Sequence, residues 1–69
     1  MIWLEVDKTD MVFTIRDINM EPLKYVNKEY ESIKIDEHER YVEIKIDSTR
    51  ILSFPLDIVI IEFFNTQET

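Results

Sequence analysis

Apolar and polar residues alternate at the start of this chain. Residues 2–6 and residues 11–16 each place every second side chain, all of them apolar, on one face. A period of two is typical of a half-buried β-strand. Residues 7–10, which separate the two stretches, are polar and suit a turn. The pattern therefore predicts an opening β-hairpin.

A second pair of alternating stretches covers residues 33–36 and 41–47. Their apolar side chains can share one face only if Ile35 lies opposite Val42, because a slip of one residue would turn one strand's apolar set to the other face. The same register places a lysine across from a glutamate, which is a favourable cross-strand pair. We expect a second hairpin with its loop at residues 37–40.

A further strand is expected at residues 50–54, and its register on the preceding strand is open between two turns. A two-residue loop would pair Asp47 with Arg50. A three-residue loop would pair Ile46 with Leu52 and bury more apolar surface, so we favour it. No glycine is present to ease either turn, and turns in this chain must use Asp, Asn, Ser and Thr.

Residues 56–64, which follow Pro55, are rich in β-branched and aromatic side chains and predict another strand. A short helix opened by the proline is the alternative. The stretch is apolar on both faces, and such a strand needs cover on both sides. The second face exceeds what one small domain can cover, so this stretch predicts an interface with another chain.

The stretch between the second and third strands is ambiguous. Met20, Leu23, Val26 and Tyr30 recur at nearly helical spacing, which predicts a short helix over about residues 20–31. The competing interpretation is a hairpin of residues 23–26 and 30–35 that turns at residues 27–29.

Together these elements predict one small β-rich α+β domain over residues 1–69, with an antiparallel sheet of about five strands and one short helix. A small all-β barrel or meander is the alternative, and residues 65–69 are expected to be a frayed tail. A chain of 69 residues lies near the lower size limit for folding without disulfides or metals. A second subunit would therefore add stability, and we expect a homo-oligomer.

Composition excludes several classes of function. The chain has no cysteine and no glycine, so disulfides, thiolate metal sites, cysteine nucleophiles and glycine-rich phosphate loops are absent. The formal net charge of −7 disfavours direct binding to nucleic acid. No stretch approaches the roughly 20 apolar residues of a membrane span, and the start lacks the features of a signal peptide. We expect a cytoplasmic protein, and the richness in Ile, Lys and Glu without Ala or Gly suggests an AT-rich virus or mobile element.

The sequence predicts no catalytic residue, no cofactor and no metal. The single histidine, His38, lies among carboxylates at residues 36–39, but neighbouring side chains in a turn rarely converge on one ion. We expect a non-enzymatic protein-binding module, an accessory or inhibitor protein that occludes a partner's surface. Its interface candidates are Leu56, Ile58, Val59, Ile61, Phe63, Phe64, Trp3 and Tyr41.

An acidic decoy that mimics nucleic acid is the alternative function. Carboxylates two residues apart on a strand are separated by ~6.6 Å, close to the spacing of successive phosphates. The candidates for such an acidic surface are Glu5, Asp7, Glu29, Glu31, Glu37 and Glu39. Basic residues interrupt these rows, which favours the first hypothesis.

Overall fold

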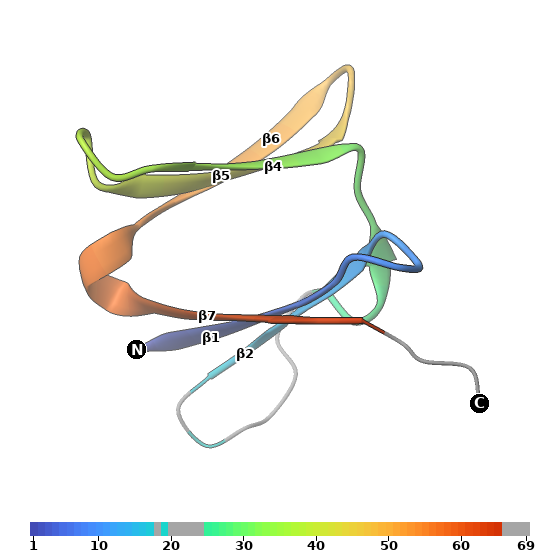
Figure 1. The fold of residues 1–69 in the computed structure, drawn as a ribbon, viewed down its shortest axis with the longest axis horizontal. Helices are drawn as coiled ribbons and strands as arrows, with labels where there is room; N and C mark the ends of the chain where they lie inside the picture. Colours follow the sequence, from blue (N-terminus) through green and yellow to red (C-terminus); the bar gives the residue numbers. More distant parts are fainter. Residues whose placement is uncertain (18, 20–24, 66–69) are drawn as a thin grey trace.

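The computed structural model describes residues 1–17, 19 and 25–65 of the chain. These residues form two β-sheets that lie one above the other (Figure 1). The fold class is therefore small and β-rich, as predicted. The described strands number seven in two sheets, not about five in one sheet.

The first sheet has the strand order β3-β2-β1-β7. Its strands are β1 (Ile2–Asp7), β2 (Val12–Arg16), β3 (Lys28–Glu29) and β7 (Val59–Phe64). β1 and β2 are antiparallel, which confirms the opening hairpin. β7 runs parallel to β1, so the first and last strands of the chain lie side by side in one sheet (Figure 1).

The second sheet has the order β4-β5-β6 and is antiparallel throughout. Its strands are β4 (Ser32–Asp36), β5 (Tyr41–Asp47) and β6 (Arg50–Pro55). In the β4–β5 hairpin Ile35 lies opposite Val42. The predicted register is therefore confirmed, because it is the one that gathers the apolar side chains on the buried face.

The favoured three-residue loop between β5 and β6 is wrong. Asp47 lies opposite Arg50 across a two-residue turn, and a β-bulge between Lys45 and Asp47 then shifts the register. Beyond the bulge Ile44 lies opposite Leu52, a pairing that neither predicted register contained.

The bulge has a simple cause. If the two-residue turn continued as a regular ladder, Leu52 would lie opposite Lys45 and would share its outer face. One extra residue in β5 reverses this phase, so that Leu52 and Phe54 join Ile44 and Val42 on the inner face. The apolar pattern and the turn chemistry are both satisfied only with the bulge.

The predicted strand 56–64 is correct only from Val59 onward. Leu56–Ile58 forms a single 3-10 turn, η1, that carries the chain from one sheet to the other (Figure 1). The short-helix alternative after Pro55 therefore describes this corner. The corner is held by a hydrogen bond from Leu56 N to Arg40 O, 3.0 Å, and by an ion pair of Arg40 with Asp57, 2.6 Å.

The predicted helix at residues 20–31 is wrong for its described part; residues 20–24 lie outside the described residues. Residues 25–31 contain no helix: they hold the short strand β3 between bends at Val26, Asn27 and Glu31. Val26, expected on the inner face of the helix, is 52% exposed. The competing hairpin is also wrong, because Lys28–Glu29 is a strand and not a turn. Tertiary contacts decide this path: Tyr25 O accepts a hydrogen bond from Ile15 N, and the Tyr25 ring packs on Phe13.

The core lies between the sheets and draws on both of them. Its buried apolar side chains are Leu4, Val6, Phe13, Ile15, Tyr30, Val42, Ile44, Ile46 and Val59. The only helical segment in the described residues is the three-residue η1, so no helix there is long enough to cross a membrane.

Candidate functional site

Large apolar side chains are exposed along η1 and β7. Ile58, Ile60, Phe63 and Phe64 are between 39 and 46% exposed. We call these four residues the β7 strip. Four such side chains within seven consecutive positions form a concentrated apolar surface, and surfaces of this kind mark interaction sites.

The strip arises because β7 is apolar on both of its faces. Val59 points inward and is buried in the core. Its burial accounts for one of the two apolar faces of β7. Ile60 points outward beside Trp3 of β1, and Phe64 lies on the same outer face beside Asp7. Burial of Val59 explains why the inner face is apolar, whereas nothing in the described core explains the apolar side chains on the outer face.

The far edge of β7 is open within the described residues, because β7 is the last strand of its sheet. Lys8 N donates a hydrogen bond of 3.0 Å to Phe64 O, so the Phe64 carbonyl points toward β1. Backbone groups of successive residues in a strand point to opposite sides. The N–H and C=O groups of Val59, Ile61 and Phe63 therefore point toward the open edge.

The other sheet edges in the described part of the chain are better protected against strand pairing. β3 has only two residues, both charged, and β6 carries Arg50 at one end and Pro55 at the other. β4 carries Lys34 at its centre. Short length, lysine and proline are the usual means by which proteins block edge-to-edge pairing. β7 has none of these, and its one charge is Glu62.

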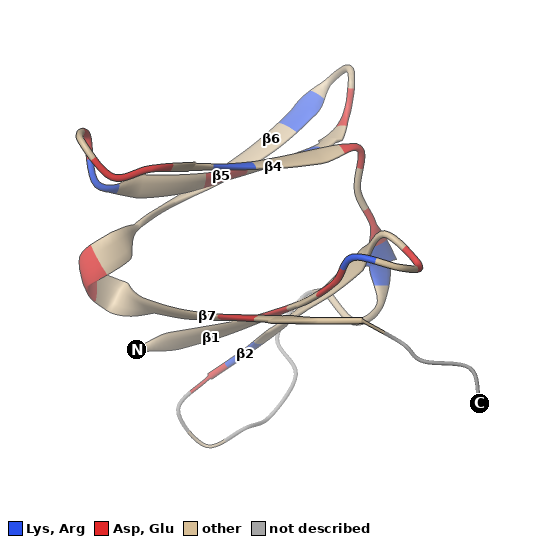
Figure 2. Cartoon of the chain, in the orientation of Figure 1, with Lys and Arg blue, Asp and Glu red and all other residues tan. Residues whose placement is uncertain are grey.

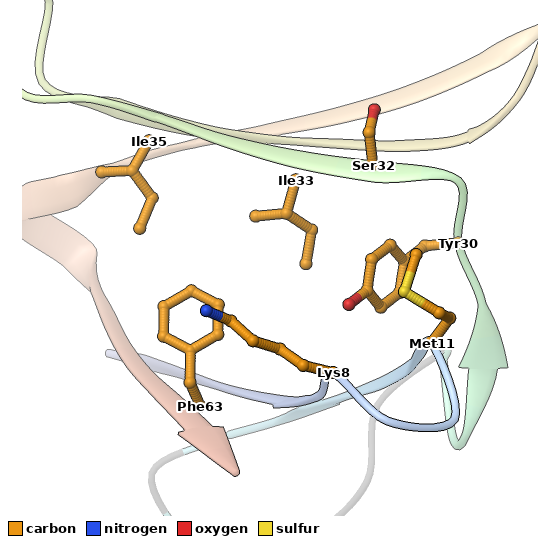
Figure 3. Close-up of a pocket in the computed structure, with 7 residues that line it drawn as sticks. All are labelled: Lys8, Met11, Tyr30, Ser32, Ile33, Ile35 and Phe63. Atoms are coloured by element: carbon orange, nitrogen blue, oxygen red, sulfur yellow. The ribbon is translucent and has the colours of Figure 1, made fainter. Parts of the chain in front are cut away.

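An open groove of about 560 Å³ lies where the two sheets diverge (Figure 3). Ile33 and Ile35 point from β4 toward Phe63 of β7 on the other side of the groove. Ile35 and Phe63 belong to inner faces and yet remain about two-fifths exposed. The core is thus incompletely covered at this end, next to the open edge of β7.

Two polar groups lie at the same groove. The ammonium group of Lys8 lies 4.5 Å from the centre of the Phe63 ring, which is a cation–π contact (Figure 3). Burial raises the pKa of the Tyr30 hydroxyl, and the nearby negative charge of Asp7 raises it further. The Tyr30 hydroxyl is therefore neutral at neutral pH, and it lies with the Lys8 ammonium group among the apolar walls of the groove.

The predicted interface candidates fall into three groups. Ile58, Phe63 and Phe64 are exposed, whereas Leu56 and Ile61 are half-buried against the core and Val59 lies within it. Trp3 is half-buried on the outer face beside Ile60, so it borders the strip. Tyr41 lies on the other sheet, opposite Pro55, and does not join the strip.

Sequence reasoning missed Ile60 and the groove. Ile60 was not among the predicted interface candidates, but it lies on the outer face and is 39% exposed. The alternation of residues 59–64 could not show which face turns inward, because both faces are apolar. Met11 and Ile35 at the groove likewise look like ordinary core positions in the sequence.

The structure does not gather the acidic candidates into one row. Figure 2 shows acidic residues in turns and strands of both sheets, with basic residues among them. Glu5 is paired with Arg16, and Glu31 with Lys45. Asp7 is buried and caps a turn. The remaining candidates divide between β3, which holds Glu29, and the β4–β5 turn, which holds Glu37 and Glu39.

His38 lies in the exposed turn between β4 and β5, where its backbone N–H donates to Asp36. Among the described residues, no group of three or more His, Cys, Asp or Glu side chains is arranged to hold a metal ion.

No known protein family, no curated protein sequence and no solved structure matches the chain.

Proposed function

We propose that this chain is a non-enzymatic protein-binding module that occludes a surface of a partner protein. The observation that carries the proposal is the β7 strip, which exposes four large apolar side chains around an unprotected sheet edge. Aromatic and aliphatic side chains grouped in this way bind other proteins well, because they bury much area and lose few torsional freedoms.

The small size of the chain and its composition support a role as an accessory or inhibitor protein of a virus or mobile element in the cytoplasm of a host cell. A module of 69 residues has little room for an enclosed active site, whereas a strip on one sheet is sufficient to cover a partner.

The test compares three immobilised proteins in a lysate of the source cells: the unaltered chain, Ile60→Lys and Ile51→Lys. Ile51 is the matched control, because it is an isoleucine of β6 that is 57% exposed and lies outside the strip. We expect a partner that the unaltered chain and Ile51→Lys retain equally. Ile60→Lys should retain at least about tenfold less, as a central interface residue would.

Circular dichroism of each variant verifies that the fold is intact before the comparison is made. Equal retention of every captured protein by the three chains would show that the β7 strip is not the working surface.

A further inference from the structure

We propose that the open edge of β7 binds a second copy of this chain. The two β7 strands would run antiparallel around a two-fold axis that passes between the two Ile61 residues. The inference rests on the proposed function, because it names an occupant for the edge of the same surface.

Geometry restricts the pairing to few registers. A two-fold axis perpendicular to the sheet makes the strands antiparallel and keeps both outer faces on one side. The hydrogen-bonded pairs must then come from Val59, Ile61 and Phe63, whose backbone groups point toward the open edge. The axis can lie at Ile60, at Ile61 or at Glu62.

Charge and hydrogen bonding select among the three registers. An axis at Glu62 would place two carboxylates directly opposite each other, which is destabilising. An axis at Ile60 would leave Phe63 opposite Asp57 of η1, outside the strand. An axis at Ile61 pairs Val59 with Phe63 of the second copy and Ile61 with its equivalent. Three pairs with two bonds each give about six hydrogen bonds.

The Ile61 register also covers the surfaces that one chain leaves exposed. Phe63, exposed at the groove although it points inward, would lie beside Val59 of the second copy. On the outer face Ile60 would lie opposite Glu62 of the second copy, so the two carboxylates fall on opposite sides of the axis.

A second copy fits this edge better than a charged partner does. β7 carries a single charge, and neither proline nor lysine interrupts it. The same strand supplies donors, acceptors and apolar side chains in a self-complementary order. Joining the two copies would produce one continuous sheet of eight strands and leave Ile60 and Phe64 of both chains on its outer face. Ile60 and Phe64 of the β7 strip would thus remain available to a partner protein in both copies, whereas Phe63 would be covered by the second copy.

Cysteine cross-linking tests the register directly, because the chain has no cysteine of its own. In the Ile61 register, Ile60 and Glu62 of the second copy form a non-hydrogen-bonded pair with Cα atoms ~4.5 Å apart, within reach of a disulfide. The Ile60→Cys and Glu62→Cys variants are mixed in a glutathione redox buffer. Mass spectrometry then quantifies the mixed disulfide and the two homodimeric disulfides. Ile51→Cys, on the other sheet, measures random collision.

We expect the mixed disulfide to exceed either homodimeric product, and the Ile51→Cys background, at least tenfold. A dominant Ile60→Cys homodimer or Glu62→Cys homodimer would overturn the Ile61 register. Cross-linking no greater than that of Ile51→Cys would overturn the second copy as occupant.

A second variant tests the dimer without cysteine. Ile61→Pro removes a backbone donor on the open edge and leaves the bonds from β7 to β1 in place, since those use residues 60, 62 and 64. Sedimentation should show a dimer for the unaltered chain and at least a tenfold larger dissociation constant for Ile61→Pro. The unaltered chain is measured over a 100-fold range of concentration that ends at about 1 mM. If it is monomeric throughout this range, the dimer is refuted.

Two variants distinguish the proposed dimer from the proposed function. Ile61→Pro should lose the dimer but still bind a partner protein through the outer face. Phe64→Glu changes the outer face away from the two-fold axis, so it should lose the partner protein but keep the dimer. Loss of lysate partners in Phe64→Glu with cross-linking unchanged would support the proposed function alone. The reverse result would support the dimer alone.

Discussion

Three aspartates, Asp7, Asp36 and Asp47, each begin a hairpin turn in a chain that has no glycine. In each turn Oδ1 accepts hydrogen bonds from the backbone N–H groups two and three residues later. This is the chemistry by which Asp stabilises turns. Left-handed backbone occurs at Met11 and Arg40, the last positions of two of these turns, where glycine would ordinarily be favoured. Part of the acidic composition is therefore structural.

Asp47 provides a pH-dependent test at this scale. The hydroxyl and N–H of Thr49 donate to Asp47 Oδ1 at 2.7 and 2.8 Å, and these bonds lower the pKa of Asp47 below its ordinary 3.8. A lowered pKa stabilises the folded state above pH 3.8, and this stabilisation is lost as the pH falls through the folded-state value. We expect Asp47→Ala to be less stable than the unaltered chain at pH 7, with the difference shrinking below pH 3.8.

Urea unfolding from pH 7 to pH 2 measures this difference. Ser48→Ala, which changes the same turn without removing a carboxylate, serves as the control and should show no such trend. A constant difference between Asp47→Ala and the unaltered chain across the whole range would contradict the role assigned to the ionised carboxylate.

At the scale of elements, β5 and β6 show how two local preferences are reconciled. The turn after Asp47 favours one register, and the apolar residues of β6 require another, so β5 carries an extra residue at Ile46. The position of the bulge, between Lys45 and Asp47, can therefore be tested by insertion of a residue in β6. Its effect is confined to the end of the hairpin that is near the turn.

Two insertions of threonine test whether the bulge lies at Ile46 or whether the hairpin accepts an extra residue at any position. A threonine inserted between Arg50 and Ile51 would lie opposite Ile46 and convert the bulge to a regular pair. We expect the free energy of unfolding to change by less than about 1 kcal/mol. A threonine inserted between Leu52 and Ser53 would turn Phe54 to the outer face and cost about 2 kcal/mol. Urea unfolding at pH 7 measures both, and equal costs would contradict the assigned register.

In the whole molecule, net charge opposes the association of two copies, whereas the exposed apolar surface favours it. Each chain carries a net charge of −7, so two copies repel each other, whereas the β7 edge brings only Glu62 into the contact. The proposed dimer must therefore be stabilised by apolar burial and backbone hydrogen bonds and opposed by long-range repulsion. The proposed dimer and an acidic decoy respond to salt in opposite directions.

We expect the dimer dissociation constant to fall at least about threefold between 0.01 M and 0.15 M NaCl, because the screening length falls from about 30 Å to about 8 Å. Sedimentation at both concentrations measures it, and Ile61→Pro should remain monomeric in both. A dimer that weakens as salt rises would instead be held by ion pairs, contrary to the apolar contact proposed for β7.

Alternation of apolar and polar residues was sufficient to predict the β-rich class, the opening hairpin and the register of β4 on β5. These features depend on alternation between neighbouring residues and on short turns, so the information is local. The sequence also identified residues 56–64 as apolar beyond the needs of one face, and this range contains all four residues of the β7 strip.

Tertiary contacts, in contrast, divide the strands into two sheets and place β7 parallel to β1, more than 50 positions away in the chain. Alternation states which residues share a face but not which distant strand lies beside them. For the same reason the exposure of Ile60, the groove beside Phe63 and the non-helical path of residues 25–31 could not be predicted. Each depends on what packs against a segment, and those neighbours are distant in sequence.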